Sequence, residues 1–247
     1  MVSSISCGLA RLRSLVTGSG RGIGRATALR FAREGAAVVL VARSQTQLEE
    51  VASQIAYMKR DCLVLPTDVS KEADVAACFG KVLNDFGQID ILIDNAGISL
   101  DRPFLETSLD EWEQVFNVNL RGVVLCTRAV LPSMLANGRG KIVNIASGAG
   151  LRGLPGNSAY AASKAAVIAL GASLASEVES HGVQVNTICP GPVDTDMLRQ
   201  SGVRDFVSKS SNLQPPEDVA SAALFLASEL AGRTSGQVIS VRTTNRW

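Results

Sequence analysis

Short runs of apolar, mostly β-branched residues alternate along the chain with longer segments of helical periodicity. The short runs predict strands at residues 14–17, 37–41, 62–66, 89–94, 141–146, 183–188 and 237–241. Helices are predicted between them, at residues 22–34, 45–60, 71–86, 109–136, 158–180 and 217–228. Ser44 with Gln47, and Ser108 with Glu111, have the spacing of capping boxes at the start of two of these helices.

The regular alternation of strand and helix predicts the fold class. Strand runs such as residues 38–41 are apolar at every position, which is typical of parallel strands that are covered by helices on both faces. No linker, charge run or fixed-period repeat divides the chain. We therefore predict one Rossmann-type, doubly wound α/β domain over residues 1–247, built on a seven-stranded parallel sheet.

Composition and charge exclude several classes of function. The 24 Lys and Arg residues against 23 Asp and Glu leave a formal net charge of +1, which favours neither nucleic acid nor an anionic membrane. The longest apolar run, residues 36–42, is far shorter than the roughly 20 residues of a membrane-spanning helix. The five cysteines are widely spaced without any CxxC pair, so we expect reduced thiols in a cytoplasmic protein and no metal site.

A cluster of glycines stands where the first strand passes into the first helix. Its residues are Thr17, Gly18, Ser19, Gly20, Arg21, Gly22, Ile23 and Gly24. Glycine permits a tight turn with positive φ, and the missing side chains let backbone N–H groups and the helix N-terminus approach a pyrophosphate. The cluster therefore predicts a dinucleotide site, with a purely structural turn as the alternative.

The end of the second strand bears on the choice of coenzyme. It reads Val41, Ala42, Arg43, without an Asp or Glu to accept hydrogen bonds from an adenosine ribose. Arg43 suits a 2′-phosphate, and Arg21 of the glycine cluster offers a second cation or is simply solvated. NADP(H) is therefore favoured over NAD(H).

Three further residues form a candidate catalytic group. Tyr160 and Lys164 are four apart on one helical pattern, so both face the same way. A nearby ammonium favours phenolate over phenol, so Lys164 is expected to bring the pKa of Tyr160 down from about 10. Ser147 ends the fifth strand, at the edge of the sheet where doubly wound proteins bind ligands. Each residue alone is commonplace, and only the conjunction indicates a site.

In their order along the chain, these motifs resemble those of the classical short-chain dehydrogenases/reductases, over roughly residues 12–241. The family's glycine motif TGxxxGxG, its YxxxK motif and its serine all find matches among the residues above. The resemblance adds the cofactor-binding residues Asp68, Val69, Asn95, Ala96, Gly97, Pro190, Gly191, Val193 and Thr195, and the catalytic residue Asn119.

The resemblance also implies roles for these residues. Ser147 positions the carbonyl, and Tyr160 gives or takes the proton. Lys164 binds the nicotinamide ribose and tunes Tyr160, and Asn119 supports a proton-relay water, whereas the cofactor supplies the hydride. A homotetramer or homodimer built through the helices at 109–136 and 158–180 is implied as well.

The sequence departs from the family pattern in three places. Asp94 stands where asparagine is common, and residues 242–247 replace the usual Asp-Gly-Gly after the last strand. In the related 3-oxoacyl-acyl-carrier-protein reductases two arginines dock the acidic carrier, and the matching positions here hold Gly138 and His181, with Arg139 next to the first.

The resulting hypothesis is an NADP(H)-dependent oxidoreductase that moves a hydride between nicotinamide and a small carbonyl or alcohol substrate, 3-oxoacyl thioesters included. The alternatives are an NAD-linked alcohol or sugar dehydrogenase and a dinucleotide-binding regulatory protein without turnover. The segment between Asp196 and Pro215 offers Met197, Leu198, Phe206 and Val207 as pocket residues for an apolar substrate.

Overall fold

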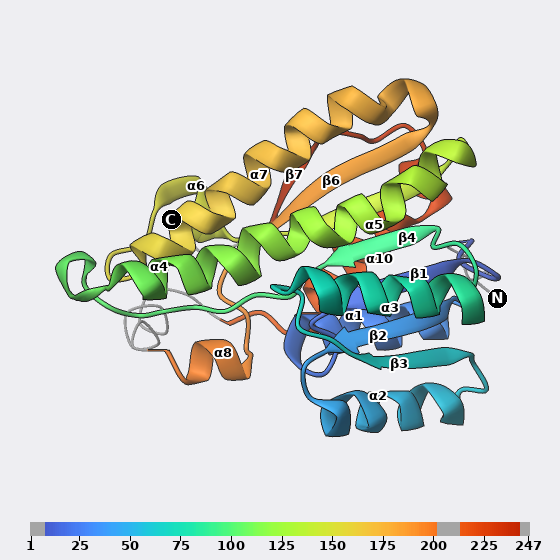
Figure 1. The fold of residues 1–247 in the computed structure, drawn as a ribbon, viewed down its shortest axis with the longest axis horizontal. Helices are drawn as coiled ribbons and strands as arrows, with labels where there is room; N and C mark the ends of the chain where they lie inside the picture. The colour runs from blue at the N-terminus through green and yellow to red at the C-terminus, as the bar shows by residue number, and fades with distance from the viewer. Residues whose placement is uncertain (1–7, 202–212, 243–247) are drawn as a thin grey trace, which may run out of the picture.

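The sheet of this protein is seven-stranded and entirely parallel, as predicted. The structure is a computed structural model, and it describes residues 8–201 and 213–242. The strand order is β3-β2-β1-β4-β5-β6-β7, so the chain winds outwards in both directions from β1 and β4 (Figure 1). The strands are β1 (Arg13–Thr17), β2 (Ala37–Ala42), β3 (Cys62–Pro66), β4 (Ile91–Asp94), β5 (Gly140–Ile145), β6 (Val183–Pro190) and β7 (Val238–Val241).

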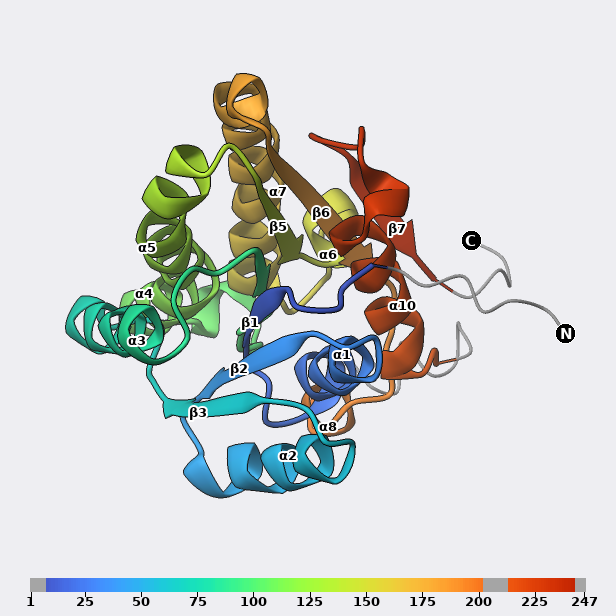
Figure 2. The ribbon, with the colours of Figure 1, turned by 90° about the vertical axis from the view of Figure 1, so that its right-hand side faces the viewer.

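Helices cover both faces of this sheet, and each face has its own apolar core (Figure 2). On one face lie α1 (Gly22–Arg33), α2 (Gln45–Tyr57) and α10 (Pro216–Ala227). On the other lie α3 (Glu72–Asp85), α5 (Gly122–Ala136) and α7 (Ser158–Val178). The continuously apolar strands are therefore buried on both sides, which confirms the doubly wound α/β prediction.

The helix predicted at 109–136 is interrupted. It consists of α4 (Leu109–Phe116), a π-helical segment η2 (Asn117–Arg121) and α5. Segments of this kind often mark functional sites, because the wider turn re-aims the side chains within it. Asn119 lies in the middle of η2.

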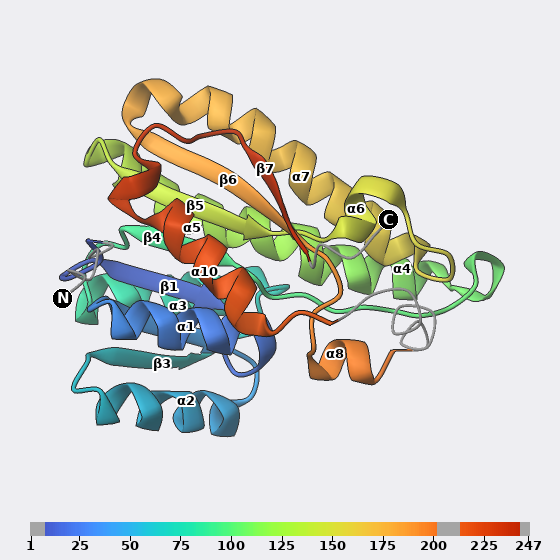
Figure 3. The ribbon, with the colours of Figure 1, turned by 180° about the vertical axis from the view of Figure 1, so that it is seen from behind.

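Several short elements had no counterpart in the sequence prediction. The helices α6 (Gly148–Arg152) and α8 (Asp196–Arg199) follow the carboxyl ends of β5 and β6 (Figure 3). Three 3-10 turns lie elsewhere: η1 (Phe104–Glu106), η3 (Glu179–His181) and η4 (Glu229–Ala231). Both short helices thus stand at the edge of the sheet where doubly wound proteins bind ligands.

One of the two predicted capping boxes is complete. Ser108 and Glu111 exchange hydrogen bonds with each other's backbone N–H groups. At α2 the Ser44 hydroxyl accepts from the N–H of Gln47, but the returning hydrogen bond is not made. The Gln47 side chain instead lies over the glycine loop, where a β-carbon on Gly20 would be 2.9 Å from its Cβ.

Three remaining expectations concern the cysteines, the pocket residues and the membrane. The four cysteines within the described residues are free thiols, as expected. Phe206 and Val207 lie outside the described residues.

Two helical stretches, Leu109–Ala136 and Ser158–His181, are long and apolar enough to cross a membrane by length and composition alone, which the prediction from the longest apolar run did not foresee. Both stretches pack against the sheet, as core helices of soluble proteins also do.

Candidate active site

A cavity of about 380 Å³ runs along the carboxyl ends of the strands, from β3 to β5. It brings together most of the residues predicted to bind a dinucleotide, although they come from six separate segments of the chain. These residues are Gly18, Gly20, Arg21, Gly22, Ile23, Arg43, Asp68, Val69, Asn95, Ala96, Gly97, Tyr160, Lys164 and Thr195.

The glycine loop and the start of α1 are suited to a phosphate. Gly18 and Gly22 have φ of 65° and 53°, a left-handed conformation that favours glycine. No side chain caps the N-terminus of α1, and its first turn contains no acidic residue. The backbone N–H groups and the positive end of the helix dipole are therefore free of competing anions, and they fit a pyrophosphate.

Thr17 supports this loop from behind and does not line the cavity. Its hydroxyl accepts hydrogen bonds from the backbone N–H groups of Asn95 and Ala96, at 2.9 and 3.0 Å, and donates to the carbonyl oxygen of Ile93. The Asn95 amide in turn donates to the carbonyl oxygen of Thr17 at 2.8 Å. Thr17 thus ties the glycine loop to the loop that follows β4.

Ser19 and Gly24 also lie behind the cavity wall. Ser19 is fully buried, and its hydroxyl donates to the carbonyl oxygen of Val41. A β-carbon on Gly24 would lie 2.2 Å from the carbonyl oxygen of Gly18, so only glycine lets α1 pack this closely on β1. Both residues shape the loop and do not line the cavity.

Positive charge gathers at the end of the cavity formed by β2 and β3. Arg43 and Arg21 are both exposed residues of the cavity wall. Asp68 is next to them: burial raises its pKa, but hydrogen bonds from Ser70 and the positive charges of Arg43 and Lys71 outweigh burial and leave the pKa below its usual value. This end of the cavity therefore offers cations for a phosphate and one ionised carboxylate.

A second cavity, of about 200 Å³, adjoins the first. Its wall contains Ser147, together with Pro190, Gly191 and Val193, which were expected to hold a nicotinamide. Tyr160 lines both cavities. The phenol therefore stands at the junction between the space that suits a dinucleotide and a smaller space that suits a substrate.

Tyr160 and Lys164 lie one turn apart on α7, as the spacing predicted. The Nζ of Lys164 is 5.9 Å from the centre of the Tyr160 ring and donates a hydrogen bond to the carbonyl oxygen of Ile145 at 2.8 Å. Ser147 begins α6, where its hydroxyl accepts from the N–H of Ala149. The three side chains of the predicted catalytic group thus converge at one end of β5.

The pKa of Tyr160 runs against the sequence-based expectation. Burial raises the pKa of the phenol above its usual 10.0, although a hydrogen bond with the Ser147 side chain acts in the opposite direction. Burial also lowers the pKa of the Lys164 ammonium to about 8. Desolvation therefore has the largest effect on the pKa of Tyr160, and the expected lowering of this pKa by Lys164 is not seen.

Asn119 is fully buried and lines neither cavity. Its side chain accepts from the N–H of Ile98 at 2.8 Å and donates to the carbonyl oxygen of Ile98 and to the Ser163 hydroxyl. Ser163 in turn donates to the carbonyl oxygen of Tyr160. The side chain of Asn119 thus acts through other groups, by tying η2 to the helix that carries Tyr160.

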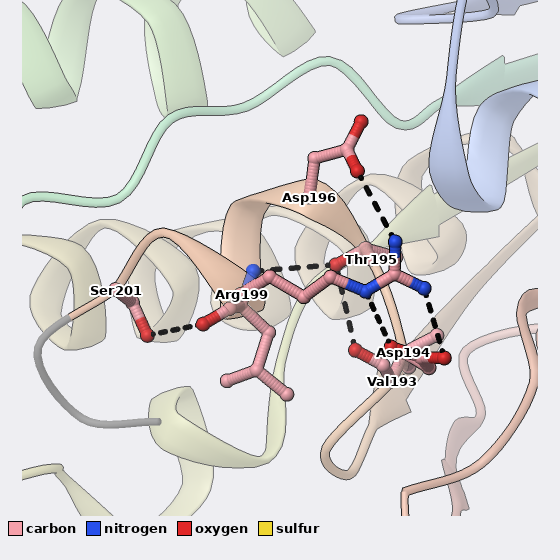
Figure 4. Close-up of polar contacts among 7 residues, drawn as sticks. Val193, Asp194, Thr195, Asp196, Arg199 and Ser201 are labelled. Atoms are coloured by element: carbon pink, nitrogen blue, oxygen red, sulfur yellow. Dashed lines mark hydrogen bonds and ion pairs between the residues drawn. The ribbon is translucent and has the colours of Figure 1, made fainter. Parts of the chain in front are cut away.

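The loop after β6 contributes Thr195 and Met197 to the walls of both cavities, and polar contacts within the loop hold it in place (Figure 4). Thr195 caps α8 by accepting from the N–H of Leu198, and Arg199 forms ion pairs with Asp194 and Asp196. Buried Gln214 holds the base of this loop, since its side chain donates to the carbonyl oxygen of Val241 at 2.8 Å.

Some cavity residues were not predicted as site residues. They are Ala42, Ser44, Gln47, Thr67, Ile98, Val118, Ile145, Ala146 and Asp196 in the larger cavity, and Arg152, Leu154 and Asn157 among others in the smaller one. Most carry no chemical signal in the sequence. Arg152 is an exception, because a lone cation directly after the Ser147 segment is a chemical signal that the sequence shows.

Asp94, the departure from the family pattern at the end of β4, is almost completely buried. Burial raises the pKa of this carboxyl well above its usual value, although a hydrogen bond from Thr127 and the charge of Lys164 act in the opposite direction. Its neighbour across the sheet, Asn144, has a buried Oδ1 without a hydrogen-bond partner. Burial therefore favours the neutral form of Asp94.

Asp94→Asn is expected to stabilise the protein increasingly as pH rises. Asp94 has a higher pKa in the folded than in the unfolded chain, so its contribution is complete below about pH 4 and is lost as pH rises towards the folded pKa, whereas asparagine does not titrate. Urea unfolding at pH 5 to 8 measures the difference. Asp90→Asn is the matched control, and it should destabilise because it removes an ion pair with Arg139. A constant gain from pH 5 to 8 contradicts the assignment.

Comparison with known proteins agrees with this geometry. The family model described as short chain dehydrogenase matches residues 13–204. The chain is 39% identical over 233 residues to a 3-oxoacyl-acyl-carrier-protein reductase of Synechocystis sp., covering 92% of this chain and 94% of the relative. A reductase of the same name from Thermotoga maritima is 36% identical over 234 residues, with the same coverage of both chains. A hydroxy(phenyl)methylsuccinyl-CoA dehydrogenase subunit of Thauera aromatica is 36% identical over 233 residues, also covering 92% of this chain and 94% of the relative.

Proposed function

Because this chain belongs to the short-chain dehydrogenase/reductase family, whose members are oxidoreductases of carbonyl and alcohol groups, we propose that it is an NADP(H)-dependent carbonyl reductase. The observation that carries the proposal is the position of Tyr160, whose phenol lines both cavities next to Ser147 and Lys164. A proton donor at this junction can act on the oxygen of a carbonyl substrate, and the larger cavity would hold the nicotinamide coenzyme that supplies the hydride.

Each residue then has a defined part in the reaction. Ser147 orients the substrate oxygen towards Tyr160, and Tyr160 donates its proton to that oxygen in the direction of reduction. Lys164 holds a ribose hydroxyl with the donors that its bond to Ile145 leaves available. Asn119 is a positioning residue, because it fixes η2 against α7 through Ser163. The bound nicotinamide supplies or accepts the hydride.

The substrate class that we propose is the 3-oxoacyl thioester, which the names of two relatives contain. Docking of an acyl carrier protein has weaker support in this chain. Arg139, the one arginine next to the family's docking positions, forms an ion pair with Asp90 at 3.2 Å. The proposal therefore names the thioester group and not the carrier.

A panel of substrates tests the proposed function. The purified full chain is mixed with NADPH or NADH and with simple ketones, 3-oxoacyl thioesters or, with the oxidised coenzymes, alcohols, and cofactor absorbance is followed. We expect oxidation of NADPH with at least one 3-oxo compound. Turnover with alcohols and NAD⁺ alone supports an NAD-linked dehydrogenase, and binding of coenzyme without any turnover supports a regulatory protein.

We also propose that residues 1–247 form one domain that works in the cytoplasm as a homotetramer or homodimer. In an apolar 18-residue window of each of the stretches that include α5 and α7, only 39% is buried within the chain, which leaves helix surface for a second copy. Light scattering is expected to give a mass of two or four 25.9 kDa chains.

A substitution that places a charge at an exposed position of α7 tests this assembly. Ala169→Arg, at an exposed position, is expected to reduce the measured mass, whereas Ala56→Arg, at an exposed position of α2, should leave it unchanged. A monomeric mass for the unmodified protein refutes the proposal.

A further inference from the structure

The asparagine at the start of the helix that carries Tyr160 does not cap that helix. Asn157 is the N-cap residue of α7, a position where asparagine side chains commonly accept from backbone N–H groups of the first turn, but no such hydrogen bond is made. The next residue does not replace it, because the buried Ser158 hydroxyl has no hydrogen-bond partner among the described residues. The side chain of Asn157 is nevertheless buried, so its carboxamide makes other contacts.

These contacts are with the segment that follows β4. The Ser99 hydroxyl donates to Oδ1 of Asn157 at 3.3 Å, and Nδ2 of Asn157 donates to Oδ1 of Asp101. A backbone hydrogen bond lies next to them, from the N–H of Arg102 to the carbonyl oxygen of Gly156 at 2.7 Å. Three hydrogen bonds therefore join this segment to the two residues that precede α7.

The same segment is anchored to the rest of the chain at both of its ends. At its start, Ile98 donates to and accepts from the Asn119 side chain in η2. At its end, Arg102 forms an ion pair with Glu111 of α4 at 3.2 Å. Asn157 thus binds a part of the chain that is itself fixed, and its hydrogen bonds restrain the start of α7.

Tyr160 stands one turn after Asn157, as the third residue of α7. Residues three apart on a helix are neighbours on its surface, and both side chains line the smaller cavity. The Ser163 hydroxyl supports the same turn from within the helix, by donating to the carbonyl oxygen of Tyr160. Burial is the main cause of the raised pKa of Tyr160, and the negative charge of Asp101 raises it further, as expected for a carboxylate that is held at this turn.

From this geometry we propose that Asn157 is a positioning residue for the reaction at Tyr160. Its carboxamide, held between Ser99 and Asp101, fixes the first turn of α7 against the wall of the smaller cavity and keeps the phenol at the junction of the two cavities. The inference rests on the proposed function and adds a residue that acts through Tyr160. A proton donor that moves away from the substrate oxygen loses rate steeply, because proton transfer needs hydrogen-bond distance.

The hydrogen bond between Asn157 and Asp101 can be broken and rebuilt by substitution. Asn157→Ala removes it, and Asn157→Asp replaces it with two facing carboxylates, which repel each other. Asp101→Asn alone keeps an acceptor oxygen for Nδ2 of Asn157. The double variant Asn157→Asp/Asp101→Asn restores a hydrogen bond in which donor and acceptor have exchanged sides. Comparison of the four variants therefore isolates the effect of this hydrogen bond.

Steady-state kinetics of these variants test the proposal. We expect Asn157→Ala and Asn157→Asp to lower kcat by about 10-fold or more, and to change KM and NADPH affinity by less than about 3-fold, because the loss falls on the chemical step. Asp101→Asn and the double variant should keep kcat within about 3-fold of the wild type. Asn137→Ala is the matched control: it also removes an asparagine hydrogen bond, to Gln88 at 2.8 Å, but Asn137 lines neither cavity.

Hydrogen exchange followed by mass spectrometry separates this inference from the proposed function, because it needs no substrate. In Asn157→Ala we expect the amides of residues 99–106 and of the first turn of α7 to exchange about 10-fold faster, and in the double variant to return to the wild-type rate. This result supports the restraint on α7 even if no ketone is reduced. Unchanged exchange, a loss of kcat that the double variant does not reverse, or a loss confined to KM overturns the positioning role and leaves the reductase proposal standing.

Discussion

Tyr160→Phe is expected to lower turnover by about 10²- to 10⁴-fold while cofactor affinity stays near that of the wild type. The variant removes the phenolic hydroxyl, which lines both cavities, and keeps the ring beside Lys164. The loss should therefore appear in kcat, because the missing proton donor acts in the chemical step. Steady-state kinetics with the best substrate of the panel and fluorescence titration with NADPH measure the two quantities.

The other tyrosine of the chain provides a matched control. Tyr57 ends α2 with 91% of its surface exposed, so Tyr57→Phe should change neither quantity. Circular dichroism of both variants establishes that the fold is kept. Near-normal turnover of Tyr160→Phe is incompatible with the proposed role of the phenol.

Arg43→Asp is expected to weaken NADPH binding by about 10- to 100-fold and to leave NADH affinity unchanged or improved. A charge-assisted hydrogen bond to a 2′-phosphate contributes roughly 1.5 to 3 kcal/mol, and a carboxylate in its place repels the phosphate. The same carboxylate can accept hydrogen bonds from the ribose hydroxyls of NADH. The ratio of the two affinities should therefore change more than either affinity alone.

The surroundings of Arg43 make this substitution informative. Arg43 lines the larger cavity next to Asp68, whose pKa its charge helps to lower against the effect of burial. Fluorescence titration of both coenzymes against wild type, Arg43→Asp and the exposed control Arg60→Asp measures the selectivity. Equal wild-type affinities for the two coenzymes, or equal losses in the variant, show that Arg43 does not contact a 2′-phosphate.

The sheet was predictable from sequence because its signal is local. Apolar runs such as that of β2 fix the strands, and the glycine loop between β1 and α1 fixes the first turn. The break at η2 was not predictable, because residues 109–136 keep one apolar pattern through the change of helix geometry. The helices α6 and α8 are too short to show a helical period.

The candidate site, too, was predictable from the sequence only in part. The spacing of Tyr160 and Lys164 predicted that they share one side of α7, but spacing does not report burial, and burial decides the direction of both pKa shifts. Gly191 and Arg242 stand far apart in the sequence, and only the pairing of β6 with β7 brings them together.

The hydrogen bonds that Thr17 makes between the glycine loop and the loop after β4 have a consequence for the speed of coenzyme association. Its hydroxyl holds the N–H groups of Asn95 and Ala96 by hydrogen bonds that lie wholly within the chain. The glycine loop and the loop after β4, which both line the larger cavity, are thereby tied together in the folded chain, and the conformational entropy of this wall is not lost a second time on binding. Capture of the dinucleotide should therefore follow simple one-step kinetics, without a slow rearrangement of the loop after encounter.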